Sequence, residues 1–335
     1  MTDTPAVMFC GHGSRDVEAI AEFDLLATHF RARLPDRDIE SGFLEFARPV
    51  IRDGLEKLKA RGAKRIHCVP GMLFAAAHVK NDLPSEVNAF AAANPDIEMR
   101  FGRELGIDTR MMAAAAARIE EAEAANPNGV PRDETLLMVV GRGTNDPDAN
   151  SNISKVARML WEGMGFGWAE VSYSGVAYPL VDAGLAHAAR LGYRRIITFP
   201  YFLFTGVLVK RIYAWVDEAA AAHPEVEFLK APYLRDHDAV IDTFAARLDE
   251  IESGQNLMNC QMCKYREQII GYEAEVGTPQ QGHHHHVQGI GTDADHHHGH
   301  HHHHHHGHDH SHDHSHDHGH DHGHLHHDHE HGTTD

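Results

Sequence analysis

Positive charge is scarce in this chain. Lys and Arg together number 30 against 49 Asp and Glu, which gives a formal net charge of −19 with histidine neutral. The last 53 residues, 283–335, hold nine of the acidic side chains and no Lys or Arg, which leaves −10 on the part that precedes them. An acidic protein repels the phosphate backbone of DNA or RNA, so we expect no nucleic-acid partner.

Long apolar runs and regularly spaced cysteines are also missing. No apolar stretch approaches the roughly 18 residues that a membrane-spanning helix needs, and the first ten residues lack the basic region of an export signal. The four cysteines are too few and too unevenly spaced for a secreted disulfide framework. We therefore expect a cytoplasmic protein that does not engage a membrane and contains no disulfides.

The remaining sequence alternates between strand-like and helix-like segments. With 42% hydrophobic residues in 335, the chain can bury the cores of about two domains. Short apolar runs predict strands, and longer amphipathic stretches predict helices. The first strands are expected at 6–10, 39–46 and 64–70, and the first helices at 17–34 and 49–61. This alternation predicts an α/β fold with a parallel sheet flanked by helices.

The same order of elements returns 130 positions later. The turn Gly11-His12-Gly13-Ser14 has its counterpart in Gly141-Arg142-Gly143-Thr144. Four further landmarks, Pro49, Pro70, Val79 and Lys80, map by the same offset onto Pro179, Pro200, Val209 and Lys210. A constant offset indicates an internal duplication that gives two similar α/β domains.

These patterns divide the chain into four parts. We expect one domain at 1–125 and a second at 134–253, with turn-forming residues between 124 and 133 as the linker, followed by a segment at 254–281 and a tail at 282–335. In open parallel sheets, ligands bind at the carboxyl ends of the strands, so we expect chemistry in the cleft between the two halves.

Three polar residues of the first half lie where strands end or helices begin. His12 follows the first strand, Glu45 lies at the end of the second, and His78 lies between the third strand and its helix. Two imidazoles and a carboxylate can bind a divalent transition metal and can also accept protons. A single histidine at a strand end is more often structural. The second half, however, has Arg142, Gly175 and Leu208 at the equivalent positions, so all three are lost together.

The motifs around these residues resemble those of the class II tetrapyrrole chelatases. They are 10–15 (CGHGSR), 43–49 (FLEFARP), 69–73 (VPGML) and 78–84 (HVKNDLP), and the similarity to long-form sirohydrochlorin cobaltochelatases spans roughly residues 5–250. The resemblance implies an enzyme that inserts Co²⁺ into sirohydrochlorin without ATP, in cobalamin biosynthesis. It also implies that His12 and His78 bind the metal and accept protons, with Glu45 as a further ligand or base. Relatives that use Fe²⁺ or Ni²⁺ leave the metal open.

A macrocycle with many carboxylates needs local positive charge or hydrogen-bond donors. The candidates lie in corresponding loops of the two halves and are Ser14, Arg15, Lys80, Arg142, Thr144, Lys210 and Arg211. The glycine-rich turns could instead cradle phosphates at helix N-termini. Neither turn completes a dinucleotide-binding or P-loop motif, so nucleotide binding is the weaker interpretation.

Cys260 and Cys263 form a C-x-x-C pair after the last predicted helix. Two thiolates at this spacing suit a soft metal or an iron–sulfur cluster, both of which usually need four ligands. The segment resembles one that holds a four-iron four-sulfur cluster in some long-form cobaltochelatases, and the missing ligands would then come from a second subunit, in a homodimer, or from elsewhere in the chain. An exposed pair or an adventitious zinc site is the alternative. Cys10 and Cys68 are expected in core strands, as small apolar residues.

The tail holds 27 of the 34 histidines, interspersed with Asp and Gly. Such a polar, low-complexity segment cannot bury enough apolar surface to fold, so we expect it to be disordered. Imidazoles and carboxylates in a flexible chain bind divalent metals weakly, which predicts a reservoir that supplies the active site. The main alternative to a chelatase is therefore a metal storage or delivery protein in which this tail is the functional part. A periplasmic-type binding protein fits less well, because the start of the sequence has no export signal.

Overall fold

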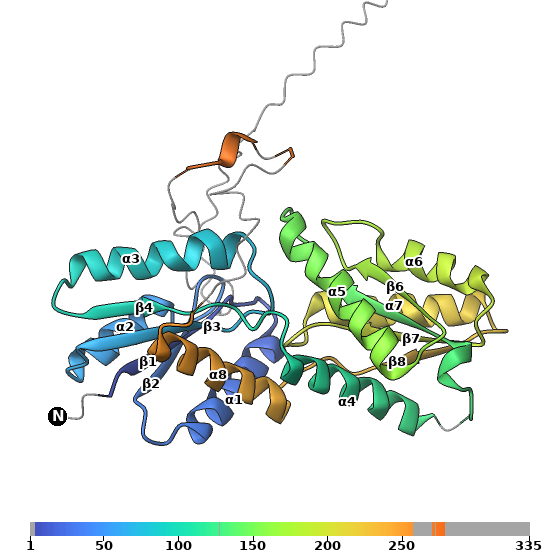
Figure 1. Ribbon diagram of the computed structural model, residues 1–335, viewed down its shortest axis with the longest axis horizontal. Helices are drawn as coiled ribbons and strands as arrows, with labels where there is room; N and C mark the ends of the chain where they lie inside the picture. The colour runs from blue at the N-terminus through green and yellow to red at the C-terminus, as the bar shows by residue number, and fades with distance from the viewer. Residues whose placement is uncertain (1–3, 127, 257–269, 272, 279–335) are drawn as a thin grey trace, which may run out of the picture. The chain divides into compact units, whose positions relative to one another are not determined.

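The computed structural model describes residues 4–126, 128–256, 270–271 and 273–278. Two four-stranded parallel sheets with helices on both faces are built from consecutive stretches of the chain, which we call the first and second repeats (Figure 1). The first sheet has the order β2-β1-β3-β4 and the second the order β6-β5-β7-β8. The strands are β1 Ala6–Gly11, β2 Ile39–Phe43, β3 Arg65–Pro70, β4 Glu98–Phe101, β5 Thr135–Gly141, β6 Trp168–Tyr173, β7 Arg195–Pro200 and β8 Glu227–Lys230. The α/β architecture and its duplication are as predicted.

The helices follow the strands in the same order in both repeats. Those of the first repeat are α1 Val17–Arg33, α2 Ile51–Ala60, α3 Leu83–Ala93 and α4 Thr109–Ala125, and those of the second are α5 Pro147–Met164, α6 Val181–Ala188, α7 Val207–Ala222 and α8 Asp238–Ser253. A π-helix, His78–Asp82, runs directly into α3. Short 3₁₀ turns occupy Arg132–Glu134, Ala189–Leu191 and Glu273–Glu275.

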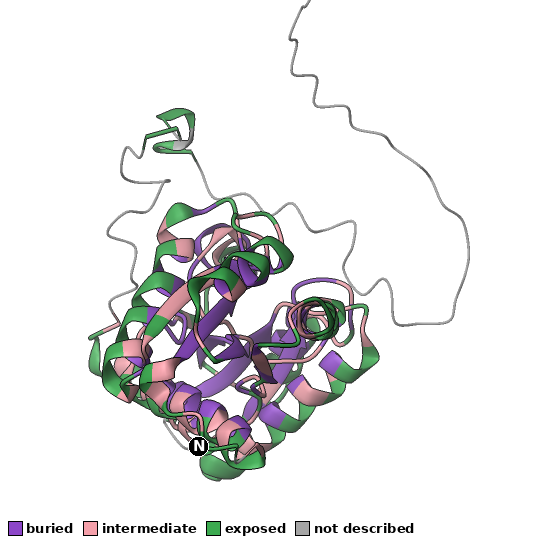
Figure 2. Cartoon of the chain, turned by 90° about the vertical axis from the view of Figure 1, so that its right-hand side faces the viewer, coloured by how far each residue is buried: buried purple, intermediate pink, exposed green. Residues whose placement is uncertain are grey.

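The central strands are apolar along their whole length because both faces of each sheet are covered. Every residue of β1 and of β5 is buried (Figure 2). A strand with helices on both sides has no solvent face, so its sequence is continuously apolar rather than alternating. This explains why 6–10 and 136–140 could be recognised as strands from composition alone.

The two repeats exchange their last helices. Helix α4 ends the first repeat but packs against α5, β7 and β8 of the second, while α8 packs against α1 and β3 of the first. The ring of Phe244 on α8 meets the ring of Phe9 edge-on with centroids 5.0 Å apart. Across the same exchange, Arg118 donates a hydrogen bond to the carbonyl oxygen of Leu234, and Arg247 donates one to the carbonyl oxygen of Leu105. The repeats are therefore joined through a common core and do not pack as independent bodies.

Two ion-pair clusters also link the repeats, and they are equivalent under the duplication. In each cluster a lysine that follows the third strand of one repeat binds two carboxylates at the start of the first long helix of the other, with N–O distances between 2.8 and 3.0 Å. The members are Lys80 with Asp146 and Asp148, and Lys210 with Asp16 and Glu18. The Lys80 side chain is 0% exposed, whereas that of Lys210 is 50% exposed. The two copies of one contact thus lie in different surroundings.

Element boundaries differ from the sequence prediction mainly after the second strand. The strand expected at 39–46 ends at Phe43, and the helix expected from Pro49 begins at Ile51. The loop between them contains Phe46 with a φ of 62°, a left-handed backbone conformation that is incompatible with a strand. Glu45 therefore lies in a loop rather than in a strand. Cys260, Cys263 and the tail lie outside the described residues.

None of the described helices is both long and apolar enough to cross a membrane.

Candidate active site

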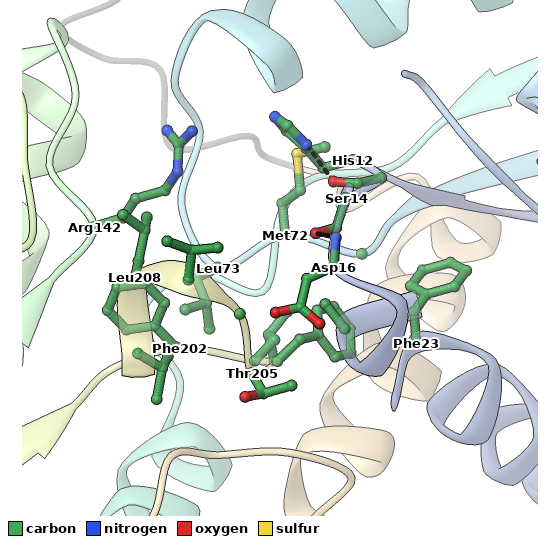
Figure 3. A pocket seen from close by; sticks show the side chains of 18 of the residues that line it. His12, Ser14, Asp16, Phe23, Met72, Leu73, Arg142, Phe202, Thr205 and Leu208 are labelled. Atoms are coloured by element: carbon green, nitrogen blue, oxygen red, sulfur yellow. Dashed lines mark hydrogen bonds between the residues drawn. The ribbon is translucent and has the colours of Figure 1, made fainter. Parts of the chain in front are cut away.

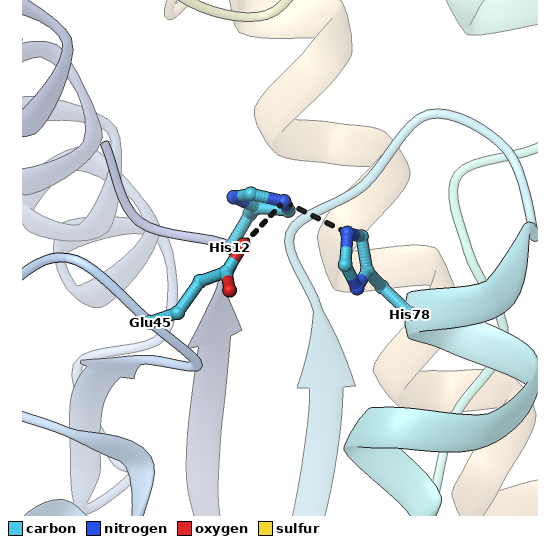
Figure 4. A group of neighbouring side chains, drawn as sticks. All are labelled: His12, Glu45 and His78. Carbon is cyan, nitrogen blue, oxygen red and sulfur yellow. Dashed lines mark hydrogen bonds and ion pairs between the residues drawn. The ribbon is translucent and has the colours of Figure 1, made fainter. Parts of the chain in front are cut away.

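His12, Glu45 and His78 come together beyond the carboxyl ends of β1 and β3 (Figure 4). His12 is the first residue after β1, and its carbonyl oxygen accepts a hydrogen bond from the backbone N–H of Glu45 at 3.0 Å. Gly13 allows this close approach, because its φ is 97° and an added Cβ would lie 1.7 Å from the Glu45 carbonyl oxygen. The glycine in the first turn thus brings the loops that carry His12 and Glu45 together.

The ligand-type atoms of the three side chains lie within 4.8 Å of one another. The two Nε2 atoms of His12 and His78 are 2.9 Å apart, and Nε2 of His12 is 3.3 Å from a carboxylate oxygen of Glu45. Glu45 is buried, whereas both imidazoles are partly exposed. The site is therefore open on one side, as a site that must take up and release an ion requires.

The remaining ring nitrogens are held by acceptors. Nδ1 of His12 lies 2.8 Å from the carbonyl oxygen of Gly13, and Nδ1 of His78 lies 2.8 Å from a carboxylate oxygen of Asp82. A carbonyl oxygen accepts a hydrogen bond, and so does an ionised carboxylate oxygen, so both contacts favour hydrogen on Nδ1 and leave Nε2 of each ring for the trio. There Nε2 of His12 faces both Nε2 of His78 and the Glu45 carboxylate, and a proton or a metal cation between these atoms would satisfy them. The geometry therefore favours binding of a cation.

His12 and His78 line a cleft of about 870 Å³ to which both repeats contribute (Figure 3). Its walls are largely apolar and aromatic, which suits a flat, conjugated ligand. The apolar lining comes from Val17, Ile20, Phe23, Phe46, Met72, Leu73 and Phe74 of the first repeat and from Tyr201, Phe202, Leu203, Phe204, Val207 and Leu208 of the second. The rings of Phe74 and Tyr201 stack across the two repeats with centroids 5.6 Å apart.

Some of the predicted substrate-binding residues line this cleft. Ser14, Arg15, Arg142, Thr144 and Lys210 all do so. The guanidinium of Arg15 stacks over the ring of Phe46 at 5.0 Å, and Arg142 is exposed on the wall opposite His12 (Figure 3). Lys210 lies at the same cleft but is paired with two carboxylates. Arginine is thus the main source of positive charge in the cleft.

The prediction that Lys80 holds substrate carboxylates is wrong for this structure. Lys80 is not among the cleft-lining residues, and its ammonium is buried between Asp146 and Asp148. Burial alone would lower the pKa of Lys80, but the hydrogen bonds that its ammonium donates to both carboxylates outweigh burial and raise the pKa. The ammonium is charged and neutralised within the protein. Arg211 also falls outside the cleft lining, since its guanidinium donates to the Ser174 carbonyl oxygen and stacks over Trp215.

Sequence reasoning missed Asp82, which contacts His78 directly, and Tyr201, whose buried ring lines the cleft. The spacing His-x-x-x-Asp was a usable signal for Asp82, because residues four apart lie on one face of a helix. No comparable signal existed for Tyr201, because an aromatic residue after a strand is most often only part of the core. In the second repeat Arg142 and Leu208, the counterparts of His12 and His78, also line the cleft (Figure 3).

Comparison with known proteins agrees with this geometry. The family model named CbiX matches the chain twice, at residues 6–122 and 136–251. A sirohydrochlorin cobaltochelatase of Priestia megaterium is 34% identical over 78% of this chain and 84% of its own length, and a sirohydrochlorin ferrochelatase of the same organism is 31% identical over 70% and 86%. The sirohydrochlorin chelatase SirB from Bacillus subtilis subspecies spizizenii, solved in complex with cobalt, is 27% identical and superimposes with a TM-score of 0.64 over 76% of this chain and 98% of that one. This chain belongs to the CbiX family.

Proposed function

We propose that this protein is a sirohydrochlorin cobaltochelatase that inserts Co²⁺ into sirohydrochlorin without ATP, in cobalamin biosynthesis. The observation that carries the proposal is the convergence of two imidazole Nε2 atoms and one carboxylate at the edge of a large apolar cleft. The 34% identical relative of matching length is a cobaltochelatase, which favours cobalt. The ferrochelatase relative makes Fe²⁺ the next candidate, followed by Ni²⁺.

Metal insertion needs ligands that hold the incoming ion and bases that accept two pyrrole protons, and the trio can supply both. Nε2 of His12, Nε2 of His78 and the Glu45 carboxylate would hold the incoming ion through three protein ligands and leave other positions for the macrocycle. As the pyrrole nitrogens replace these ligands, the released imidazoles and carboxylate can take up the two pyrrole protons. Binding and proton transfer then use the same atoms in succession, so the ion is transferred without an external base.

The cleft would hold the macrocycle by its face and by its rim. The aromatic and aliphatic walls bury the conjugated ring system, while Arg15 and Arg142 stand where peripheral carboxylates can reach them. Ser14 and Thr144 add hydroxyl groups that already accept backbone hydrogen bonds from Asp16 and Asp146 and keep an O–H to donate. Substrate binding would thus use both repeats, although the metal ligands come from one.

The tail would act as a reservoir of divalent metal that raises the ion concentration near the cleft. Its 27 histidines provide many weak sites, and weak sites exchange quickly. Such a reservoir suits an enzyme that must compete for scarce cobalt in the cytoplasm, where we propose that it works.

A four-iron four-sulfur cluster does not fit the thiolates of one chain. Cys10 and Cys68 are fully buried in β1 and β3, so only Cys260 and Cys263 remain for a site that needs four. A homodimer that pools two pairs is the arrangement under which a cluster would form. Iron and sulfide analysis of the protein purified without air, combined with its mass in solution, tests this: a cluster on a monomer would contradict the shared arrangement.

The decisive experiment is an absorbance time course of sirohydrochlorin with Co²⁺, Fe²⁺ or Ni²⁺ and purified protein. His12→Ala is the test variant, and His223→Ala is its matched control. Both histidine side chains are 29% exposed and both lie 3.3 Å from a carboxylate oxygen, but His223 is not part of the trio. We expect rapid cobalt insertion that His12→Ala abolishes and His223→Ala retains.

Two results would contradict the proposal. Insertion no faster than the spontaneous reaction would favour the metal storage or delivery function instead. Equal loss of activity in both variants would contradict the trio as the catalytic site. The relative rates with the three metals decide which ion the enzyme prefers.

A further inference from the structure

We propose that Asp82 is a positioning residue that fixes the ring of His78 for metal transfer. The proposal rests on the function argued above, because it assigns a task within the same site. Asp82 lies one helical turn after His78, and its carboxylate oxygen Oδ2 is 2.8 Å from Nδ1 of the imidazole. Its side chain is 0% exposed. Asp82 holds the ring of His78 and is not a fourth ligand of the trio.

The carboxylate of Asp82 is itself held on its other side. Its second oxygen, Oδ1, accepts a hydrogen bond of 2.7 Å from the side-chain amide of Asn81. A buried carboxylate is costly unless its oxygens are satisfied, so its position here is strongly restrained. A restrained acceptor fixes both the rotation of the His78 ring and the nitrogen that carries the hydrogen. Nε2 is then presented as a lone pair toward Nε2 of His12, at 2.9 Å.

The backbone at this point contains an extra residue relative to the second repeat. Up to Lys80 and Lys210 the two repeats differ by 130 positions, but Pro95 and Pro224, which follow the next helices, differ by 129. The structure accommodates the added residue in the π-helix His78–Asp82, where the N–H of Leu83 donates to the carbonyl oxygen of His78. The equivalent stretch of the second repeat lies inside the regular helix α7.

The extra residue and His78 occur in the same repeat. A short π-helix has poorer hydrogen bonds than a regular α-helix, and such segments are frequent at functional sites. In the second repeat the counterpart of His78 is Leu208, and the counterpart of Asp82 is Ile212 or Arg211 depending on where the insertion is placed. Neither can accept a hydrogen bond from an imidazole. The second repeat, which lacks the counterpart of His78, therefore also lacks a carboxylate at the position of Asp82 and the π-helix.

Loss of the Asp82 carboxylate should weaken the use of Co²⁺ far more than it alters the binding of sirohydrochlorin. Removing the hydrogen-bond partner of a metal-binding histidine typically costs about 10- to 100-fold in metal affinity or activity. Asp82→Leu removes the acceptor, and Asp82→Asn leaves one oxygen for two donors, Asn81 and His78. For both variants we expect the KM for Co²⁺ to rise by about 10- to 100-fold, while the KM for sirohydrochlorin stays as in the wild type.

The control separates positioning from general stability. Asp146→Asn alters a carboxylate that is also buried, at 2% exposed, and is bound to Lys80, but is not a member of the trio. A purely structural loss lowers the amount of active enzyme, and so kcat, without changing either KM. We therefore expect Asp146→Asn to leave the KM for Co²⁺ unchanged even if it lowers the melting temperature.

The outcomes are distinct. If the wild type inserts cobalt and folded Asp82→Asn keeps the wild-type KM for Co²⁺, the positioning role of Asp82 is refuted and the chelatase function stands. If the wild type inserts no metal, the proposed function itself fails. Should Asp82→Leu not fold, Asp82→Asn preserves the volume and decides the question alone.

Discussion

Lys80→Met is expected to destabilise the protein strongly, whereas its counterpart Lys210→Met is not. The Lys80 ammonium is 0% exposed and lies 2.8 and 2.9 Å from the carboxylates of Asp146 and Asp148, which are 2% and 13% exposed. Methionine fills a similar volume but leaves two carboxylates without their cation. Breaking a buried ion pair in this way costs about 3–5 kcal/mol. For a body of this size the melting temperature should then fall on the order of 10 °C.

The duplication supplies the control for this prediction. Lys210 makes the same two contacts at 3.0 and 2.9 Å, but it is 50% exposed, so water replaces the lost partner. We expect Lys210→Met to shift the midpoint of urea or thermal unfolding by no more than the scatter between wild-type preparations. Circular dichroism at 222 nm, a conventional helix signal, follows both transitions.

A double variant tests whether charge is the cause. In the Lys80→Met background, Asp146→Asn removes one uncompensated carboxylate and should raise stability, although the same change should lower it in the wild type. Asn keeps an oxygen for the helix-capping hydrogen bond that Asp146 accepts from the N–H of Asp148. The reasoning is refuted if Lys80→Met unfolds with the wild-type midpoint, or if Asp146→Asn has the same sign in both backgrounds.

Three further predictions follow from single residues and from the tail. Glu104 is buried, one of its carboxylate oxygens lacks a hydrogen-bond partner among the described residues, and burial raises its pKa. The ionised side chain therefore costs more stability as the pH rises above the unfolded-state pKa of about 4.3. Glu104→Gln should raise the melting temperature at pH 8 and change it little at pH 4, and an equal gain at both pH values would contradict this. Arg142→Ala should raise the KM for sirohydrochlorin by about 10-fold or more, as expected for a lost charge-assisted hydrogen bond, and leave the KM for Co²⁺ unchanged. In steady-state kinetics, a fall in kcat with both KM values unchanged would instead indicate a purely structural role. Deleting residues 283–335 should leave activity unchanged at saturating cobalt but lower it at scarce cobalt; loss under both conditions would rule out a reservoir.

The fold and the trio could be predicted because they depend on local sequence and on one comparison within the chain. Apolar runs and glycine-rich turns gave the strands and the loops after them, and the offset of 130 showed which polar residues occur in one copy only. The place of Lys80 could not be predicted in this way. Its carboxylate partners lie 66 and 68 residues away, and nothing local distinguishes it from Lys210, which lines the cleft. Charge type is visible in a sequence, but burial is decided by packing between the repeats.

Asp82 could be predicted only in part. The offset between the repeats changes from 130 at Lys80 to 129 at Pro95, which indicates that the first repeat has one residue more in this stretch. What the sequence did not give was the direction of the carboxylate, since four residues along a π-helix and four along an α-helix point differently. The hydrogen bond to His78 therefore required the structure.

The asymmetry of the two repeats follows from the substrate proposed for them. A duplicated cleft begins with two equivalent sets of loops, but a tetrapyrrole has one central metal position, so a second set of ligands would hold a competing ion beside it. Replacing His12, Glu45 and His78 by Arg142, Gly175 and Leu208 removes that second set and turns the wall into a surface for a flat, anionic ring. Restoring the lost ligands by Arg142→His, Gly175→Glu and Leu208→His should then slow insertion rather than double it, because the opposing wall would lose its charge and apolar surface; a faster enzyme would show that the second repeat is not specialised for the macrocycle.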